Sequence, residues 1–247
     1  MSPLGIIGGS GLGRMDELEL EREALVSTPW GSPSAPLVHG RLAGRPVVFL
    51  ARHGSEHVLA PHEINYRANL WALHEAGVRR VIAVNTVGGI SERCVPGALA
   101  IPHQLIDYSW GRAQTFSGAQ GRPLQHVDFT EPYGRALRTL LLAAAARAGL
   151  PAIDGGVYAV TQGPRLETAA EIDRLARDGC DLVGMTGMPE AGLARELGME
   201  YACCAVIVNR AAGRGTDIHA EFERWVQEGM TAVRRVLLAA VAGEGPA

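Results

Sequence analysis

The sequence has few cysteines, no excess of positive charge and no long apolar run. The four cysteines form no Cys-x-x-Cys pair, so we expect reduced thiols in a cytoplasmic protein, without a disulfide framework or a cysteine-based metal site. The net charge of −3 argues against broad attraction to nucleic acid. Residues 140–146 are apolar, but a membrane helix needs about 20 such residues. We therefore expect no membrane contact, and the first residues lack the features of a signal peptide.

The composition and the apolar pattern predict one α/β domain over residues 1–247. Apolar runs typical of buried strands alternate with segments of helical period. We expect strands at 4–7, 47–51, 81–84, 98–101, 156–160, 181–185 and 202–208, and helices at 64–76, 134–148, 169–177, 190–197 and 221–240. Fully apolar strands between helices favour a mostly parallel, mixed central sheet with helices on both faces. The polar, glycine-rich stretch 109–125 is expected to be a long loop.

Polar residues follow several of the expected strands, at the edge where open α/β sheets bind ligands. The turn 8–13 carries Ser10, and backbone N–H groups in such a turn can point at an anion. A plain tight turn is the alternative. A dinucleotide fingerprint would need glycine at position 14, which is Arg14, so the pattern argues against a dehydrogenase.

Two further strand ends carry groups suited to an oxyanion. Arg52 can bind an oxyanion through two N–H groups, and His53 can add a donor. A surface arginine and a structural histidine would give the same pattern. Asn85 and Thr86 follow the strand at 81–84, and the glycines after them permit a ligand to approach closely. A simple strand-to-turn transition is the other interpretation.

Two neighbouring segments combine a carboxylate, an apolar side chain and a hydroxyl. Segment 162–168 contains Glu167, and segment 184–190 contains Met185 beside a threonine. This mixture suits a purine nucleoside held beside phosphate, although Glu167 could simply be a first-turn acid of a helix. Asn209 ends the last expected strand, and its carboxamide can donate and accept, which fits a purine edge with N7 and a 6-oxo group.

With these pieces in this order, the chain resembles the trimeric nucleoside phosphorylases, the family of purine nucleoside and methylthioadenosine phosphorylases. The resemblance extends over nearly the whole chain. Its most specific parts are Gly-Ile-Ile-Gly-Gly-Ser-Gly at 5–11, Arg-His-Gly at 52–54, His57 with Pro61 and Asn-Tyr-Arg-Ala-Asn at 65–69, Gly-Pro-Arg at 163–165 with Glu167, and Gly-Met-Thr-Gly-Met-Pro-Glu at 184–190.

The resemblance implies the fold of this family, inorganic phosphate as co-substrate, and no metal or other cofactor. It implies a phosphate site made of Ser10, Arg52, His53, Asn85, Thr86 and Thr186. It places Met185 beneath the ribose and gives the catalytic contacts with the purine to Glu167 and Asn209. The implied reaction is phosphate-dependent cleavage of the N-glycosidic bond, which makes the protein a pentosyltransferase of purine salvage.

Two departures from the methylthioadenosine branch concern the base. That branch carries Asp-Tyr-Asp where this chain has Asn209, Arg210 and Ala211, and a small hydroxyl residue where this chain has Glu167. A carboxylate can accept N1–H of hypoxanthine or guanine, whereas adenine has no proton at N1. Because an unpaired buried polar group can cost orders of magnitude in specificity, we expect a 6-oxopurine nucleoside as the substrate.

The 5′ end of the sugar is expected to face the start of the last helix, where His219 and Phe222 lie. A histidine suits a 5′-hydroxyl and an apolar residue suits a methylthio group, and the sequence leaves both open. Because 52–54 and 163–165 resemble the methylthioadenosine branch, the expected reaction converts S-methyl-5′-thioinosine to hypoxanthine and 5-methylthioribose 1-phosphate. The alternatives are an inosine and guanosine phosphorylase, a methylthioadenosine phosphorylase, and a non-catalytic purine- or phosphate-binding protein.

The resemblance also implies an oligomer. A homotrimer is expected, with a homohexamer as the alternative. His126 matches a histidine that, in the methylthioadenosine branch, reaches into the pocket of the neighbouring subunit. We therefore expect the region 109–131 to complete the site of a neighbour, and a surface histidine in a loop is the other interpretation.

Overall fold

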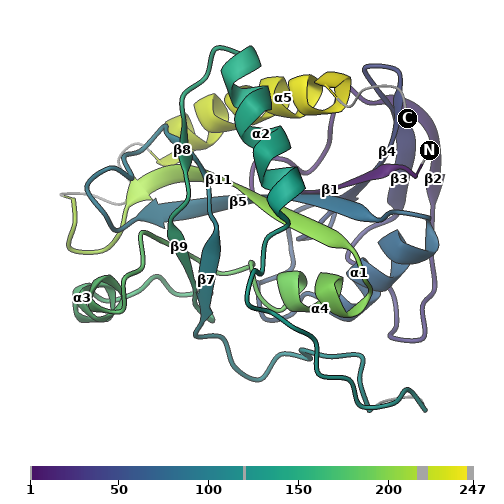
Figure 1. Ribbon diagram of the computed structural model, residues 1–247, viewed down its shortest axis with the longest axis horizontal. Coiled ribbons are helices and arrows are strands. Elements are labelled where there is room, and N and C mark those ends of the chain that lie inside the picture. Colours follow the sequence, from purple (N-terminus) through teal and green to yellow (C-terminus); the bar gives the residue numbers. More distant parts are fainter. Residues whose placement is uncertain (1, 119–120, 216–221, 244–247) are drawn as a thin grey trace.

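A computed structural model describes residues 2–118, 121–215 and 222–243 of the chain. Strands and helices alternate along most of it (Figure 1). The elements are, in order, β1 Leu4–Gly8, β2 Glu19–Ala24, β3 Leu37–Leu42, β4 Arg45–Ala51, α1 Tyr66–Glu75, β5 Arg80–Gly89, β6 Leu99–Ile101, β7 Gln104–Asp107, α2 Arg135–Arg147, β8 Ala152–Asp154, β9 Val157–Val160, α3 Ala169–Arg177, β10 Leu182–Gly184, α4 Glu190–Glu196, β11 Glu200–Arg210 and α5 Phe222–Gly243.

One mixed sheet holds the eleven strands of the described chain, in the main order β2-β3-β4-β1-β5-β10-β9-β7. Strand β5 is its centre, because it pairs in parallel with β1 and β11 and antiparallel with β10. The short strands β6 and β8 extend from β11. The predicted single-domain sheet with a parallel majority is confirmed.

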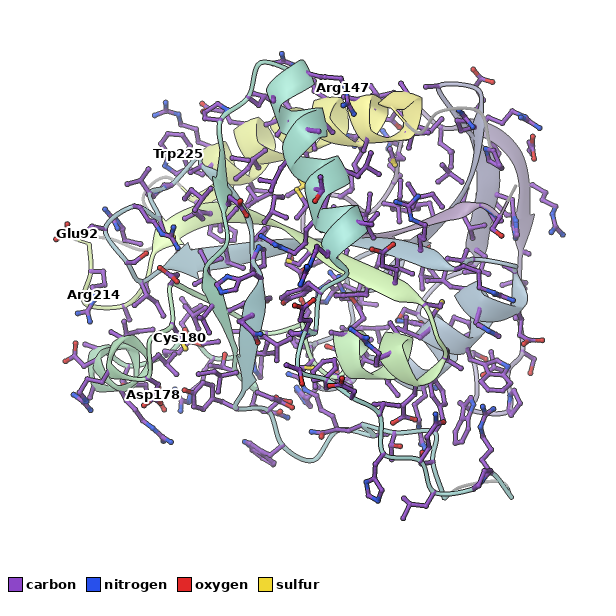
Figure 2. The ribbon with its side chains drawn as sticks, in the orientation of Figure 1. Glu92, Arg147, Asp178, Cys180, Arg214 and Trp225 are labelled. Carbon is purple, nitrogen blue, oxygen red and sulfur yellow. The ribbon has the colours of Figure 1, made fainter. Side chains whose placement is uncertain are left out.

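Helices cover both faces of the sheet, as predicted. In Figure 1, α2 and α5 lie on one side of β5 and β11, and α1 and α4 lie on the other. Each pair of helices buries its apolar side chains in a separate core cluster. Arg147 joins the first pair, because its Nη2 donates to the Ala239 carbonyl at 3.0 Å (Figure 2).

The structure corrects the ends of the two central strands. We expected the strands at 81–84 and 202–208 to stop before Asn85 and Asn209, but β5 continues to Gly89 and β11 to Arg210. The two strands pair in parallel over almost their full lengths. This pairing supplies backbone partners for residues that the sequence would place in turns.

Helix α3 begins with a capping box, which fixes the chain just before it. The Thr168 side chain accepts from the Glu171 N–H, and the Glu171 carboxylate accepts from the Thr168 N–H. Such a box satisfies two N–H groups at the helix start. It therefore holds Glu167, the residue before the cap, in a defined position.

No helix of the described residues is long and apolar enough to cross a membrane.

Candidate active site

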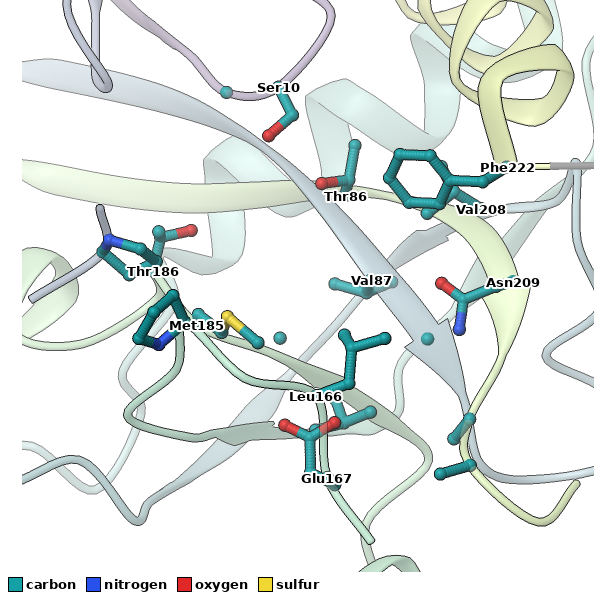
Figure 3. A pocket seen from close by; sticks show the side chains of 18 of the residues that line it. Ser10, Thr86, Val87, Leu166, Glu167, Met185, Thr186, Val208, Asn209 and Phe222 are labelled. Atoms are coloured by element: carbon teal, nitrogen blue, oxygen red, sulfur yellow. The ribbon is translucent and has the colours of Figure 1, made fainter. Parts of the chain in front are cut away.

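One cavity collects most of the residues that the sequence singles out (Figure 3). It lies where β5, β10 and β11 approach their carboxyl ends, together with the turns that follow β1 and β4. The predicted site residues that line it are Ser10, Arg52, His53, Thr86, Glu167, Met185, Thr186, Asn209, Ala211 and Phe222. Asn85, Arg210 and His126 are not among its lining residues.

One end of the cavity is rich in hydroxyl groups. In Figure 3 the hydroxyls of Ser10, Thr86 and Thr186 point toward a common space. The turn after β1 approaches closely here, since a Cβ on Gly9 would lie 2.9 Å from Nη1 of Arg52. Hydroxyls, backbone N–H groups and a guanidinium are the donors that bind an oxyanion.

Arg52 is fully buried and held by a carboxylate. Its Nε and Nη2 donate to Glu190 Oε1 and Oε2, both at 2.8 Å, and its Nη1 donates to the Val84 carbonyl at 2.9 Å. Tyr201 donates to Glu190 Oε2 at 2.8 Å. Burial alone would lower the Arg52 pKa, but the Glu190 carboxylate reverses this and raises it. The guanidinium therefore stays protonated beside the cavity, but the pair of N–H groups that we expected to bind an oxyanion is occupied by Glu190.

His53 is neutral at physiological pH. Burial, followed by the charge of Arg52, lowers its pKa from 6.5 to about 4. Its Nδ1 lies 2.8 Å from the Leu59 carbonyl, and because a carbonyl only accepts, Nδ1 carries the hydrogen. The other ring nitrogen, Nε2, is left as an acceptor. We did not anticipate this polarity from the sequence, where His53 is expected to be a donor.

His57 lies beside these groups in a sparsely populated backbone conformation, with φ of 56°. Its Nε2 lies 3.3 Å from Ser10 Oγ, and its ring centroid is 4.5 Å from that of His53. A non-glycine residue at positive φ is uncommon. The motif drew attention to His57, but only the structure shows its contact with Ser10.

Asn85 lies behind the cavity wall. It is 1% exposed, and its Nδ2 donates to Thr186 Oγ1 at 2.7 Å. The Cys203 thiol donates to its Oδ1 at 3.2 Å. The side chain that we expected to contact phosphate is thus engaged by two protein groups.

The opposite end of the cavity carries Glu167 and Asn209 (Figure 3). Thr161 donates its hydroxyl to Glu167 Oε1 at 2.6 Å, which leaves Oε2 with the capacity to accept from a ligand. Asn209 lies at a register shift of β11 against β5. Such bulges re-aim side chains next to active sites. One amide hydrogen of Asn209 goes to the Arg210 carbonyl at 2.7 Å.

The two residues after Asn209 behave differently. Arg210 turns away from the cavity, and its guanidinium donates to the carbonyls of Ser91, Glu92 and Cys94. We expected Arg210 among the substrate contacts, and instead it anchors a loop. Ala211 does line the cavity and is 2% exposed. The wall here offers no charged group to the base.

Apolar side chains form the walls between the two ends. Met185 packs against Gly163, where a Cβ would come 2.4 Å from the Met185 sulfur. Phe222 reaches the cavity from the first turn of α5. The sequence reasoning missed Val87, Leu166, Val183 and Val208, which also line it. Val87 and Val208 are next to Thr86 and Asn209 on β5 and β11, and Leu166 precedes Glu167 in the loop before α3; this closeness to predicted residues was the available signal.

Arg112 is a second group that the sequence reasoning missed. Although it lies in the long loop, it is only 9% exposed. Its Nη1 donates to the carbonyls of Met185 at 2.8 Å and Met188 at 2.6 Å. Its Nη2 donates to those of Thr161 at 3.2 Å and Gln162 at 2.8 Å. Arg112 thus ties together the two segments that carry the base and ribose residues.

One further predicted residue lies apart from this cavity. His126 is exposed, in a segment between β7 and α2 that runs past α4 and away from the sheet in Figure 1. His219 lies outside the described residues. Within the described ranges, no group of three His, Cys, Asp or Glu side chains could hold a metal ion.

A family model described as the phosphorylase superfamily matches residues 3–242. This chain belongs to that superfamily. The family expected from the sequence motifs is confirmed.

Related proteins agree with this membership. The chain is 52% identical over 239 residues to a probable S-methyl-5′-thioinosine phosphorylase of Pseudomonas syringae pv. tomato, covering 96% of this chain and 97% of the relative. It is 43% identical to a 6-oxopurine nucleoside phosphorylase of Pyrococcus furiosus, covering 98% and 92%. The structure of methylthioadenosine phosphorylase from Schistosoma mansoni with tubercidin has a TM-score of 0.91 at 32% identity, covering 98% and 91%.

Proposed function

We propose that this superfamily member catalyses phosphate-dependent cleavage of the N-glycosidic bond of a 6-oxopurine nucleoside. Its preferred substrate is S-methyl-5′-thioinosine, and the products are hypoxanthine and 5-methylthioribose 1-phosphate. This activity makes it a pentosyltransferase of purine salvage. The proposal includes a cytoplasmic location, in keeping with four free, buried cysteines, and it requires no metal or other cofactor.

The observation that carries the proposal is that polar groups of two different kinds lie at the two ends of this cavity. Hydroxyls and the Arg52 guanidinium lie at one end, and Glu167 and Asn209 lie at the other. Between these two ends the cavity is lined by apolar side chains, including Met185. An anion and a purine base therefore have separate subsites, with room for a ribose between them.

The mechanism follows from this arrangement. Phosphate at the hydroxyl end approaches the anomeric carbon while the glycosidic bond lengthens and the ribosyl group becomes cationic. The departing purine gains negative charge, which Asn209 stabilises by donating its remaining amide hydrogen near N7 and O6. Glu167 accepts N1–H and orients the ring. The rate enhancement comes from positioning and electrostatic stabilisation, not from a covalent intermediate.

The base subsite favours a 6-oxopurine. Thr161 already donates to Glu167 Oε1, so the other oxygen faces the ligand as an acceptor, and it matches a protonated N1. Adenine would place a lone pair there. At Ala211 the wall supplies no carboxylate to accept from a 6-amino group. A relative named as a 6-oxopurine nucleoside phosphorylase supports the same base preference.

Phe222 supports a methylthio group at the 5′ position. It lines the cavity from the start of α5, and an aromatic ring offers apolar contact without a hydrogen-bonding atom. Inosine remains the second candidate substrate, because the P. furiosus relative bears a 6-oxopurine name without a 5′ modification. The 5′ substituent, rather than the base, separates the two candidates.

The deciding experiment compares phosphate-dependent base release from S-methyl-5′-thioinosine, inosine and S-methyl-5′-thioadenosine at equal concentration. We expect fast hypoxanthine release from methylthioinosine and slow release from the other two. A preference for inosine would contradict the apolar 5′ subsite. A preference for methylthioadenosine would contradict the assignment of Glu167 and Asn209 to a 6-oxo base, and no cleavage with any of the three would leave a binding protein.

The proposal extends to a homotrimer, or a homohexamer, in which His126 enters a neighbour's site. Trp110 and Leu124, in the same segment as His126, are 70% and 72% exposed, which suits burial against another copy. Ultracentrifugation gives the mass of the assembly. Mixing subunits bearing His126→Ala with subunits bearing Glu167→Gln tests the shared site: partial recovery of activity is expected, and no recovery would contradict it.

A further inference from the structure

The side chain of Asn85 is buried behind the cavity and connects Cys203 to Thr186. It stands on β5, beside β11 on one side and near the chain that leaves β10 on the other. Asn85 is 1% exposed and Cys203 is fully buried. Neither lines the cavity, whereas Thr186 does. The three side chains therefore form a line from the interior of the sheet to the hydroxyl end of the cavity.

The direction of each hydrogen bond in this line is fixed by chemistry. The Cys203 thiol gives its hydrogen to Asn85 Oδ1 at 3.2 Å, and Asn85 Nδ2 donates to Thr186 Oγ1 at 2.7 Å. Burial raises the pKa of Cys203 well above its usual value, so the thiol keeps its hydrogen. The reversed amide would offer its N–H to sulfur, which is a weak acceptor.

A threonine hydroxyl has one hydrogen to donate and lone pairs to accept. Because Asn85 already supplies a donor to Oγ1 of Thr186, the hydroxyl hydrogen is free to point elsewhere. Figure 3 shows the Thr186 hydroxyl directed toward the space shared with Ser10 and Thr86. An anionic oxygen bound there needs a donor, and this arrangement offers it one.

We infer that Asn85 is a positioning residue, which holds Thr186 as a hydrogen-bond donor to phosphate without touching phosphate itself, and that Cys203 fixes the orientation of its amide. The inference rests on the proposed function, since it assigns phosphate to the hydroxyl end. It differs from the expectation that Asn85 is a phosphate contact, and the two ideas predict different outcomes in a double mutant.

The first test is a mutant cycle of Asn85→Ala, Thr186→Ala and the double variant. Loss of one hydrogen bond to a charged group should raise the KM for phosphate about tenfold in each single variant. If Asn85 acts through Thr186, the double variant should be no worse than Thr186→Ala. Multiplied effects would mean that Asn85 contacts phosphate directly and would overturn the inference.

The variant Asn85→Asp tests the direction of the hydrogen bond from Asn85 to Thr186. A carboxylate has no hydrogen to give, so it would draw the Thr186 hydroxyl hydrogen toward itself and away from phosphate. We expect a phosphate KM above that of Asn85→Ala, with the nucleoside KM changed less than twofold. Equal increases in both KM values would indicate general damage to the site and would contradict a positioning role.

The two neighbouring cysteines provide a matched control. Cys203 and Cys204 are both fully buried on β11, but they belong to core clusters on opposite faces of the sheet. Cys203→Ala should raise the phosphate KM severalfold, Cys203→Ser should restore it with a hydroxyl donor, and Cys204→Ala should leave it unchanged. An equal change of the phosphate KM in both alanine variants would mean that Cys203 does not orient Asn85.

Calorimetric titration with inorganic phosphate alone separates this inference from the proposed reaction. If the protein binds phosphate but cleaves no nucleoside, the proposed function fails while the mutant cycle can still be read from the Kd for phosphate. If the wild-type protein does not bind phosphate at all, the inference fails with it. Thermal unfolding of each variant confirms that the folded protein is being titrated.

Discussion

Glu167 presents one carboxylate oxygen to Thr161 and the other to the cavity. The change Glu167→Gln would replace an obligate acceptor with a group that can also donate. We expect kcat/KM for methylthioinosine to fall by about a hundredfold while that for methylthioadenosine rises or stays constant. The ratio of the two values, measured at saturating phosphate, is the readout, and an unchanged ratio would show that Glu167 does not read N1.

Arg112 shows how a residue without substrate contact can set the shape of a site. Its guanidinium donates to four carbonyls in the segments that carry Glu167 and Met185. The ammonium of a lysine lacks the planar fork needed to reach both segments. We expect Arg112→Lys to raise the nucleoside KM about tenfold and to leave the phosphate KM within twofold.

Arg122 is the control for Arg112, because it lies in the same long segment but is exposed. Its guanidinium carbon lies 4.8 Å from the centroid of the Trp71 ring, whereas the four carbonyls accept from Arg112. Arg122→Lys should leave the steady-state constants of the purified protein near their wild-type values. Equal losses in the two variants would contradict the role of Arg112 as a brace.

At the scale of elements, α5 is set against β11 by a glycine. A Cβ on Gly229 would lie 2.2 Å from Val206 Cγ1. Alanine usually stabilises a helix by about 1 kcal/mol relative to glycine, but here we expect Gly229→Ala to destabilise the protein by about 1–3 kcal/mol, because the helix must move off the sheet. Urea unfolding gives the free energy.

The first turn of α5 carries Phe222, so a displaced helix should also raise the nucleoside KM. Gly192 in α4 is the matched control, since a Cβ there would meet only Met188 Cε, at 3.4 Å. Gly192→Ala is expected to be neutral or slightly stabilising. If the two alanine variants have equal free energies of unfolding, the close packing of α5 on β11 does not contribute to stability.

The sequence predicted the apolar core strands and all five described helices to within a few residues, because their periodicity is strong. It missed β2, whose residues are nearly all exposed and largely charged, the neighbouring strand β3, and the short strands β7 and β8. Those strands exist through pairing with other strands of the sheet, which the pattern of a single segment does not reveal. The extension of β5 through Asn85 has the same cause.

The candidate site shows a similar division. Types of residue suited to phosphate and purine could be named from the sequence, and ten of those named line one cavity. The direction in which each side chain points could not be predicted from the sequence. Asn85 and Arg210 are next to lining residues on their strands, but each turns to protein partners. Arg112 carried no motif, because its role depends on carbonyls from loops distant in sequence.

At the scale of the whole molecule, His53 links stability to pH. Its pKa is about 4 in the folded protein, against about 6.5 for an unperturbed histidine. The unfolded chain therefore takes up the proton first as the pH falls. The free energy of unfolding should decrease between pH 6.5 and 4, by up to about 3 kcal/mol from this residue.

The measurement is urea unfolding at several pH values for the wild type and for His53→Gln. The difference between the two profiles isolates the histidine from carboxylates that titrate nearby. We expect the wild type to lose more stability than the variant over this interval and the two slopes to agree above pH 7. Parallel profiles throughout would mean that the pKa of His53 is the same in the folded and unfolded protein.

The ion pair of Arg52 with Glu190 can form only late in the synthesis of the chain. Its partners are 138 positions apart, and at about 5–20 residues per second Glu190 is made roughly 7–28 seconds after Arg52. Strand β11, which covers one edge of β5, emerges later still. Until then the nascent chain exposes the edge of β5 that β11 will cover and the Arg52 cation without its carboxylate partner. Most of the polypeptide must therefore be synthesised before the oxyanion pocket can form. A truncated product that ends before α4 would lack Glu190 and with it the pocket.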